Sequence, residues 1–197
     1  MAERRSGVAR HRHMVISPQR IVTNNALLWG LAWLIVGSIL CWYFRMVPTS
    51  SLSYDISGYV SLHQSLLLNV AVWIISTAPF WLVAVLLNRG VAMLELFGRM
   101  LYAHWPVTLL LLPAVCGWRM EYAVLVNDVS AALDSSVSVT AIMLLLYAIV
   151  AVWYLYWSYI AFRHVVQRRG AHLFVGYIVA MTAAMVLTAV SLKEMLW

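Results

Sequence analysis

The sequence predicts an all-α integral membrane protein, a bundle of five transmembrane helices with a cytoplasmic N-terminus and a C-terminus outside. The first observation is composition: 64% of the 197 residues are hydrophobic and 10% are charged, against about 45–50% and about 25% in a soluble domain. The mean hydropathy of +0.86 indicates lipid as the solvent. The second observation is five apolar runs, each near the length of about 20 residues that a spanning helix needs. This composition excludes a soluble enzyme, a disulfide-stapled secreted domain and a disordered chain.

A basic tail, residues 1–25, precedes the predicted membrane domain, residues 26–197. Five arginines stand in this tail, at positions 4, 5, 10, 12 and 20. Basic residues beside a membrane are attracted to anionic lipid headgroups. We therefore expect the tail to contact lipid headgroups, and we expect no nucleic acid partner.

The five predicted spans cover residues 26–44, 65–87, 101–117, 139–162 and 173–192. They are too uniformly apolar for surface helices and lack the alternation of barrel strands, so helices are the way to satisfy their backbones in lipid. With these spans, ten of the 13 Lys and Arg residues fall on the side of the tail. Positive charge marks the cytoplasmic face, which sets the predicted orientation. Aromatic residues near span ends, Trp105 and Trp157 among them, are interpreted as interfacial anchors.

The connections between spans also carry patterns. In residues 46–63, Leu52, Ile56, Tyr59 and Val60 stand at helical spacing, which predicts a short helix lying in the membrane interface. Residues 118–138 mix apolar residues with acids and serines in the same way. In residues 91–100, Glu95 and Arg99 are four apart in the order that favours a helical ion pair. This segment is expected to extend the third span along the inner interface.

Patterns that carry chemistry are missing from the sequence. It contains no metalloprotease, nucleophile-elbow or phosphate-loop motif, and no Asp, Glu, Lys or Arg falls within a predicted span. Cys41 and Cys116 lie in apolar runs and are too few for a disulfide framework. The expectation is a protein that is not an enzyme, with no catalytic, cofactor-binding or metal-binding residue.

A cavity between the second and third spans is the alternative that the sequence leaves open. Pro79, Pro106 and Pro113 interrupt helical hydrogen bonding in these spans, and bent neighbours can open a space between them. Asn69 and His104 are the polar side chains that such a cavity would use. The competing interpretations are ordinary packing for the prolines, helix–helix hydrogen bonding for Asn69, and a hydrogen-bonded or interfacial role for His104. Hydroxyls at Ser76, Thr77 and Thr108 are expected to bond to their own helix backbone.

The fifth span carries a ridge of small residues every four positions, Gly176, Ala180, Ala184 and Thr188. Small residues at this spacing let helix backbones approach closely. The ridge is expected to pack on another helix of the chain or on a second subunit. Trp153, Trp157 and Ile160 share one face of the fourth span and are the predicted cover.

Two stretches resemble the Yip family, the Ypt-interacting five-span membrane proteins. FGRMLYAHWPVTLLLLP, residues 97–113, is similar to the third span of that family, and WYLYWSYIAFRHVVQRRG, residues 153–170, is similar to its fourth span and basic exit. The short tail is typical of bacterial members. The resemblance implies no catalytic residue.

Two functions from different classes follow. The first is a non-enzymatic adaptor, assembly or membrane-organising factor that contacts a membrane-protein partner, or a second copy of itself, through helix faces. The alternative is a protein that transports or handles a lipid or small molecule in the cavity between spans two and three. The expected location is the cytoplasmic membrane in a bacterium or an endomembrane in a eukaryote.

Overall fold

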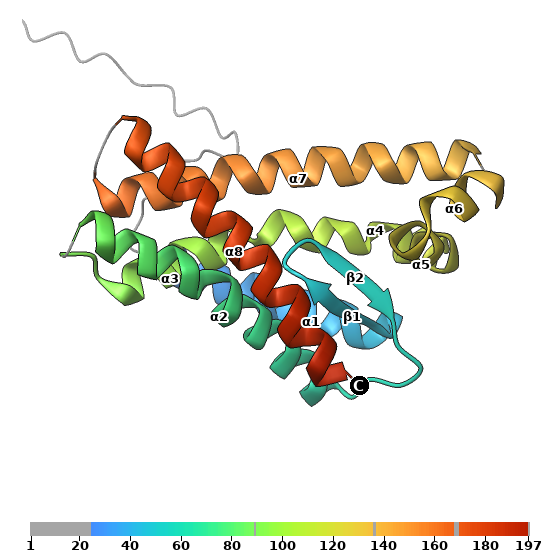
Figure 1. The fold of residues 1–197 in the computed structure, drawn as a ribbon. Helices are drawn as coiled ribbons and strands as arrows, with labels where there is room; N and C mark the ends of the chain where they lie inside the picture. The colour runs from blue at the N-terminus through green and yellow to red at the C-terminus, as the bar shows by residue number, and fades with distance from the viewer. Residues whose placement is uncertain (1–24, 89, 136, 168–169, 197) are drawn as a thin grey trace, which may run out of the picture.

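The computed structural model describes residues 25–88, 90–135, 137–167 and 170–196, so the predicted basic tail, apart from Asn25, lies outside the described residues. Four helices of the described chain are long and apolar enough to cross a membrane (Figure 1). They are α1 (Ala26–Phe44), α2 (Leu62–Leu87), α7 (Val137–Val166) and α8 (Ala171–Leu196). The integral membrane class is confirmed. The four helices overlap the first, second, fourth and fifth predicted spans, and α1 begins and ends at the same residues as the first predicted span.

The third predicted span is not one continuous helix. The chain forms α3 (Met93–Ala103), the 3₁₀ helix η2 (Trp105–Leu111) and the short helix α4 (Leu112–Val115). Pro106 and Pro113 each stand in the first two positions of a new segment. A proline there loses no hydrogen bond, whereas in a helix interior it would remove one. The prolines therefore divide this helix, and α3 begins before the predicted span.

Residues 46–63 do not form the predicted interfacial helix. They form a hairpin of two antiparallel strands, β1 (Met46–Ser50) and β2 (Ser53–Ile56), so the bundle is not purely helical. Polar and apolar residues alternate along β2, as SYDI, which is the strand period that the sequence analysis overlooked. Tyr54 is buried, whereas Tyr59 beyond the strand is 79% exposed. Four residues at helical spacing were too few to outweigh this alternation.

The connection of residues 118–138 does contain helices, α5 (Arg119–Asn127) and α6 (Val129–Ser135). Asp128 separates them, and its Oδ1 accepts hydrogen bonds from the backbone N–H groups of Ser130 and Ala131 at 2.9 and 3.2 Å. This is the capping of a helix N-terminus by a side chain. At the start of α5, Arg119 Nη1 donates to the carbonyl of Phe44 at 2.9 Å, which satisfies a backbone group at the end of α1.

The small-residue ridge packs inside the chain, on α2. A Cβ on Gly176 would lie 2.9 Å from Leu87 Cδ1 and 3.1 Å from Val83 Cγ1, and Ala180 and Ala184 are fully buried. The α2–α8 contact is the most extensive between any two described elements. The prediction that Trp153, Trp157 and Ile160 cover the ridge is wrong, because α2 covers it.

The aromatic residues of α7 pack instead on α3 and η2. Trp157 stacks on Tyr102 with ring centres 5.5 Å apart, and Trp153 meets Trp105 edge-on at 5.1 Å. Trp105 also stacks on Trp33 of α1 at 5.1 Å. Trp105 and Trp157 therefore belong to an aromatic cluster between the helices. Stacking of this kind adds about 0.5–1.5 kcal/mol per pair beyond burial.

α1 and α3 cross at a glycine. A Cβ on Gly30 would lie 2.8 Å from Leu101 Cγ and 2.9 Å from the backbone nitrogen of Tyr102, so only glycine allows this approach.

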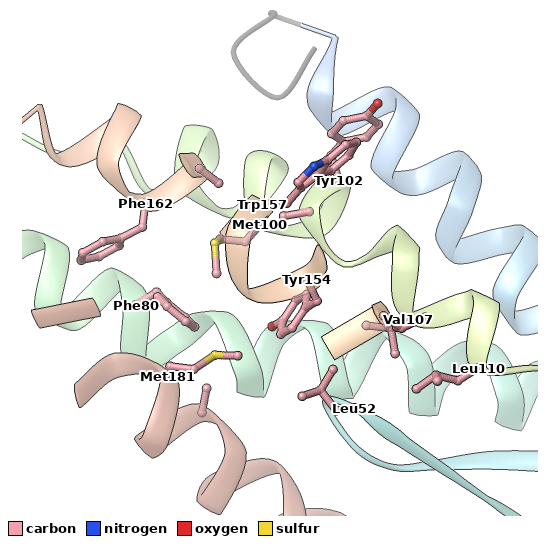
Figure 2. Packing of buried hydrophobic residues seen from close by; sticks show 14 of the residues in the cluster. Leu52, Phe80, Met100, Tyr102, Val107, Leu110, Tyr154, Trp157, Phe162 and Met181 are labelled. Atoms are coloured by element: carbon pink, nitrogen blue, oxygen red, sulfur yellow. The ribbon is translucent and has the colours of Figure 1, made fainter. Parts of the chain in front are cut away.

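Pro79 was expected to break the second span, but α2 continues through it. The core that results joins the helices and the hairpin in one buried cluster (Figure 2), to which Leu52, Phe80, Tyr154 and Met181 belong.

Candidate functional site

A small cavity lies where the hairpin meets the helices, and it is the strongest candidate for a site. Its walls come from α1, α2, α3, η2 and β2. Among the residues that line it are Gly37, Tyr54, Asn69, Trp73, His104 and Thr108. The structure thus brings Asn69 and His104, the two side chains of the cavity hypothesis, to one place.

Asn69 lies about two turns inside α2 and bonds to its own helix. Its Nδ2 donates to the Ser65 carbonyl at 2.9 Å, and Ser65 Oγ donates to the Ser38 carbonyl of α1 at 2.8 Å. The bond between α1 and α2 is therefore made by Ser65. The Asn69 side chain lies against the cavity and within hydrogen-bonding reach of the Cys41 thiol.

His104 ends α3 and is deeper in the bundle than predicted. Its backbone N–H donates to the Met100 carbonyl at 3.0 Å, and its ring meets that of Tyr154 edge-on, with centres 5.3 Å apart. The 11 residues of α3 separate it by about 16 Å from the start of that helix. Because α3 begins eight residues before the predicted span, His104 lies at the C-terminal end of a helix and not in its first turn.

The neighbouring hydroxyls of Ser76 and Thr108 donate hydrogen bonds to nearby backbone carbonyls, as predicted. Ser76 Oγ donates to the Trp73 carbonyl at 3.1 Å, and Thr108 Oγ1 donates to the Trp105 carbonyl at 2.7 Å. Such bonds use the hydroxyl protons, so these oxygens can offer a substrate acceptors but no donor. Thr77 is buried.

The size of the cavity decides what it accommodates. Its volume is about 20 Å³. A water molecule needs about 10–15 Å³ on this measure, whereas pockets for metabolites measure about 300–1,000 Å³. In this conformation the cavity has room for one water and for no lipid or metabolite.

The hairpin supplies site residues that the sequence analysis did not single out. Its tip is rich in hydroxyls: Ser53 Oγ lies 2.6 Å from Ser50 Oγ and 2.9 Å from Thr49 Oγ1. Ser51 is 1% exposed, and its Oγ has no hydrogen-bond partner among the described residues. The run PTSSLS was the available signal, since clustered hydroxyls between short apolar segments indicate a tight turn.

The predicted ion pair on α3 is confirmed. Arg99 Nη2 lies 2.6 Å from Glu95 Oε1, with the arginine side chain 7% exposed and the glutamate 45% exposed. Within the described ranges no three His, Cys, Asp or Glu side chains form a group suited to a metal ion. Cys41 is buried and Cys116 is exposed, and both are free thiols.

Comparison with protein-family models, with characterised proteins and with solved structures finds no match for this chain.

Proposed function

We propose that this chain is a non-enzymatic, five-span membrane protein of the Yip type, acting as an adaptor or membrane-organising factor through helix-face contacts. The fifth crossing in this proposal is the divided segment α3–η2–α4. Its 11, 7 and 4 residues add up to about 36 Å if collinear, more than the hydrocarbon thickness of about 30 Å. The segment runs beside α7, which supports a crossing. The N-terminus is then cytoplasmic and the C-terminus outside.

The observation that carries the adaptor function is an apolar seam along the outer face of α7. The seam consists of Ile142, Leu145, Ile149, Val152 and Tyr156, each at least 52% exposed. Their spacing alternates between three and four residues, which is the seam that one helix offers to another in left-handed packing. The ridge of α8 is occupied by α2, whereas the seam of α7 is exposed along its length and open to a partner helix.

Site-specific photo-crosslinking in native membranes tests this proposal. A photoreactive residue at Ile149 is compared with one at Val179 on α8, which is 56% exposed against 52% for Ile149 and so controls for contact with lipid. We expect a product of defined mass from position 149 and none from position 179. That mass identifies either a second copy of this chain or another membrane protein. Equal products at both positions, or products at neither, would contradict the seam. Robust catalysis or transport by the purified protein in liposomes would overturn the adaptor function.

The second candidate, handling of a lipid or small molecule, is favoured by one observation: Asn69 and His104 line the same cavity. Its test is native mass spectrometry of the protein and of the double variant Asn69→Ala, His104→Ala. A specific bound molecule that the double variant loses would favour this candidate. The same bound species in both proteins would remove it.

A further inference from the structure

The hairpin packs between helices of the bundle. β1 packs against α8, α2 and α1, while β2 packs against α5 and η2 (Figure 1). A strand of five residues covers about 17 Å, roughly half the hydrocarbon thickness of a bilayer. Leu52 at its tip is 6% exposed and belongs to the central cluster with Tyr154 and Met181 (Figure 2). Non-helical backbone at membrane depth is tolerated where protein encloses it, and the helices around the hairpin provide that enclosure.

The hairpin is held mainly by apolar contact. Its hydrogen bonds are largely internal, between its own strands and hydroxyls. A side-chain bond that leaves it, from Asn127 Nδ2 to the Asp55 carboxylate, is long at 3.4 Å. The pairing register is also irregular between Pro48 and Ser50. Such a unit can leave its place without breaking the hydrogen bonds of a helix.

The docked position of the hairpin is unfavourable for the hydroxyl group of Ser51. Its Oγ is buried at the tip and has no hydrogen-bond partner in the described part of the chain. A buried hydroxyl without a partner loses the hydration that it would have in water. Exposure of the tip restores that hydration, so Ser51 favours withdrawal of the hairpin.

Polar groups lie beneath the hairpin. Tyr54 and Asn69 both line the small cavity. Cys41 of α1 is 0% exposed and lies within electrostatic range of Tyr54 and hydrogen-bonding reach of Asn69. Removal of β2 would therefore uncover the Cys41 thiol and enlarge the cavity at the same moment.

We propose that the hairpin, residues 46–56, is a plug that withdraws reversibly while the helices stay folded, opening the cavity lined by Asn69 and His104. The closed state is the one described above, with space for a single water. In the open state this cavity is wider and extends to the hairpin end of the bundle. This device is independent of the adaptor function, and its test requires no knowledge of a ligand.

Cys41 is a built-in reporter of the opening. The chain has two cysteines, and Cys116 is exposed, so the variant Cys116→Ser leaves Cys41 as the single thiol. The full-length variant is purified in mild detergent and reacted with N-ethylmaleimide, and mass spectrometry follows the modified fraction with time. We expect slow modification of the native protein, at a rate set by the fraction of open hairpin.

Three further substitutions in this background separate opening of the plug from global unfolding. Leu52→Ala weakens the docked tip and should accelerate labelling about 30-fold, the lower end for a buried leucine. Leu173→Ala is its matched control, since Leu173 is also buried, 2% exposed against 6% for Leu52, and lies in the first turn of α8. It should leave the labelling rate unchanged. Ser51→Ala removes the unpartnered hydroxyl and should slow labelling about fivefold or more.

Equal acceleration by Leu52→Ala and Leu173→Ala would overturn the proposal, because Cys41 would then react through global unfolding. Absence of labelling under native conditions would overturn it as well. If Leu52→Ala does not fold, the labelling rate of Cys41 in the Ser51→Ala variant is compared with that in the Cys116→Ser background. An unchanged or faster rate refutes the plug.

Discussion

Replacement of Gly30 by alanine tests the close crossing of α1 and α3. The added Cβ meets the backbone nitrogen of Tyr102 at 2.9 Å and Leu101 Cγ at 2.8 Å. A backbone atom gives way only if a helix moves, and overpacking of a core costs about 1–3 kcal/mol. Alanine regains about 1 kcal/mol over glycine in a helix interior. The net expectation for Gly30→Ala is therefore a loss of about 0–2 kcal/mol in the free energy of unfolding.

Gly176→Ala is the matched control, because it makes an equally close approach to different atoms. Its Cβ would meet Leu87 Cδ1 at 2.9 Å and Val83 Cγ1 at 3.1 Å, both at the ends of side chains. These ends can move by a few tenths of an ångström, so the helix gain of about 1 kcal/mol is largely kept. Gly30→Ala should thus be less stable than Gly176→Ala by about 1–3 kcal/mol.

The assay is reversible denaturation in detergent, followed by the fluorescence of the ten tryptophans, with the midpoint and slope fitted for each variant. Gly58→Ala provides the baseline, since no atom lies within 4 Å of its added Cβ. A Gly30→Ala protein as stable as Gly176→Ala would refute the reasoning that the α1–α3 crossing excludes a side chain.

Three other predictions concern single polar contacts. Hydrogen bonds from Ser130 and Ala131 lower the pKa of Asp128, so its cap stabilises α6 above the ordinary carboxyl pKa of about 3.9 and is lost as the pH falls through the lowered value. Hydrogen exchange at the first amides of α6 should show this acid-induced loss in the native protein, and Asp128→Asn, which still caps, should not show it. Tyr177→Phe removes the bond from Tyr177 Oη to the Leu155 carbonyl, 2.8 Å long, and should cost about 0.5–1.5 kcal/mol in the same denaturation assay; an unchanged midpoint would contradict a role for this bond in linking α7 to α8. Arg119→Met keeps the length of the side chain but loses the donor at the end of α1, so exchange should increase in the last turn of α1, and unchanged exchange there would argue against this cap.

The divided third helix shows what the positions of prolines in the sequence can predict and what they cannot. Pro106 and Pro113 were recognised in the sequence as breaks in helical hydrogen bonding, and both prolines start new segments. The same rule failed at Pro79, where α2 continues. The difference arises from packing, because Pro79 and Phe80 are buried among the neighbouring helices, which hold α2 in place despite the missing bond.

The candidate site was predictable only in part. Asn69 and His104 were identified because polar groups are rare in apolar runs, but their meeting in one cavity depends on how α2 packs against the end of α3. Tyr54 and Ser51 were missed because the run PTSSLS indicates a turn but carries no sign that this turn folds back into the bundle. Such a path is stabilised by contacts with residues far along the chain, as between Leu52 and the cluster of Tyr154 and Met181.

The sequence by itself determined the membrane class and the approximate positions of four spanning helices. Both follow from the length and uniformity of apolar runs, because in lipid a backbone must satisfy its hydrogen bonds within its own helix. Only the tertiary structure decided that the α8 ridge packs on α2 and that the α7 tryptophans face η2. The same holds for the packing of the hairpin against α1, α2, α5, α8 and η2. Lipid-facing and protein-facing helix surfaces are equally apolar, so which face meets which helix depends on shape and on close approach at glycines such as Gly30 and Gly176.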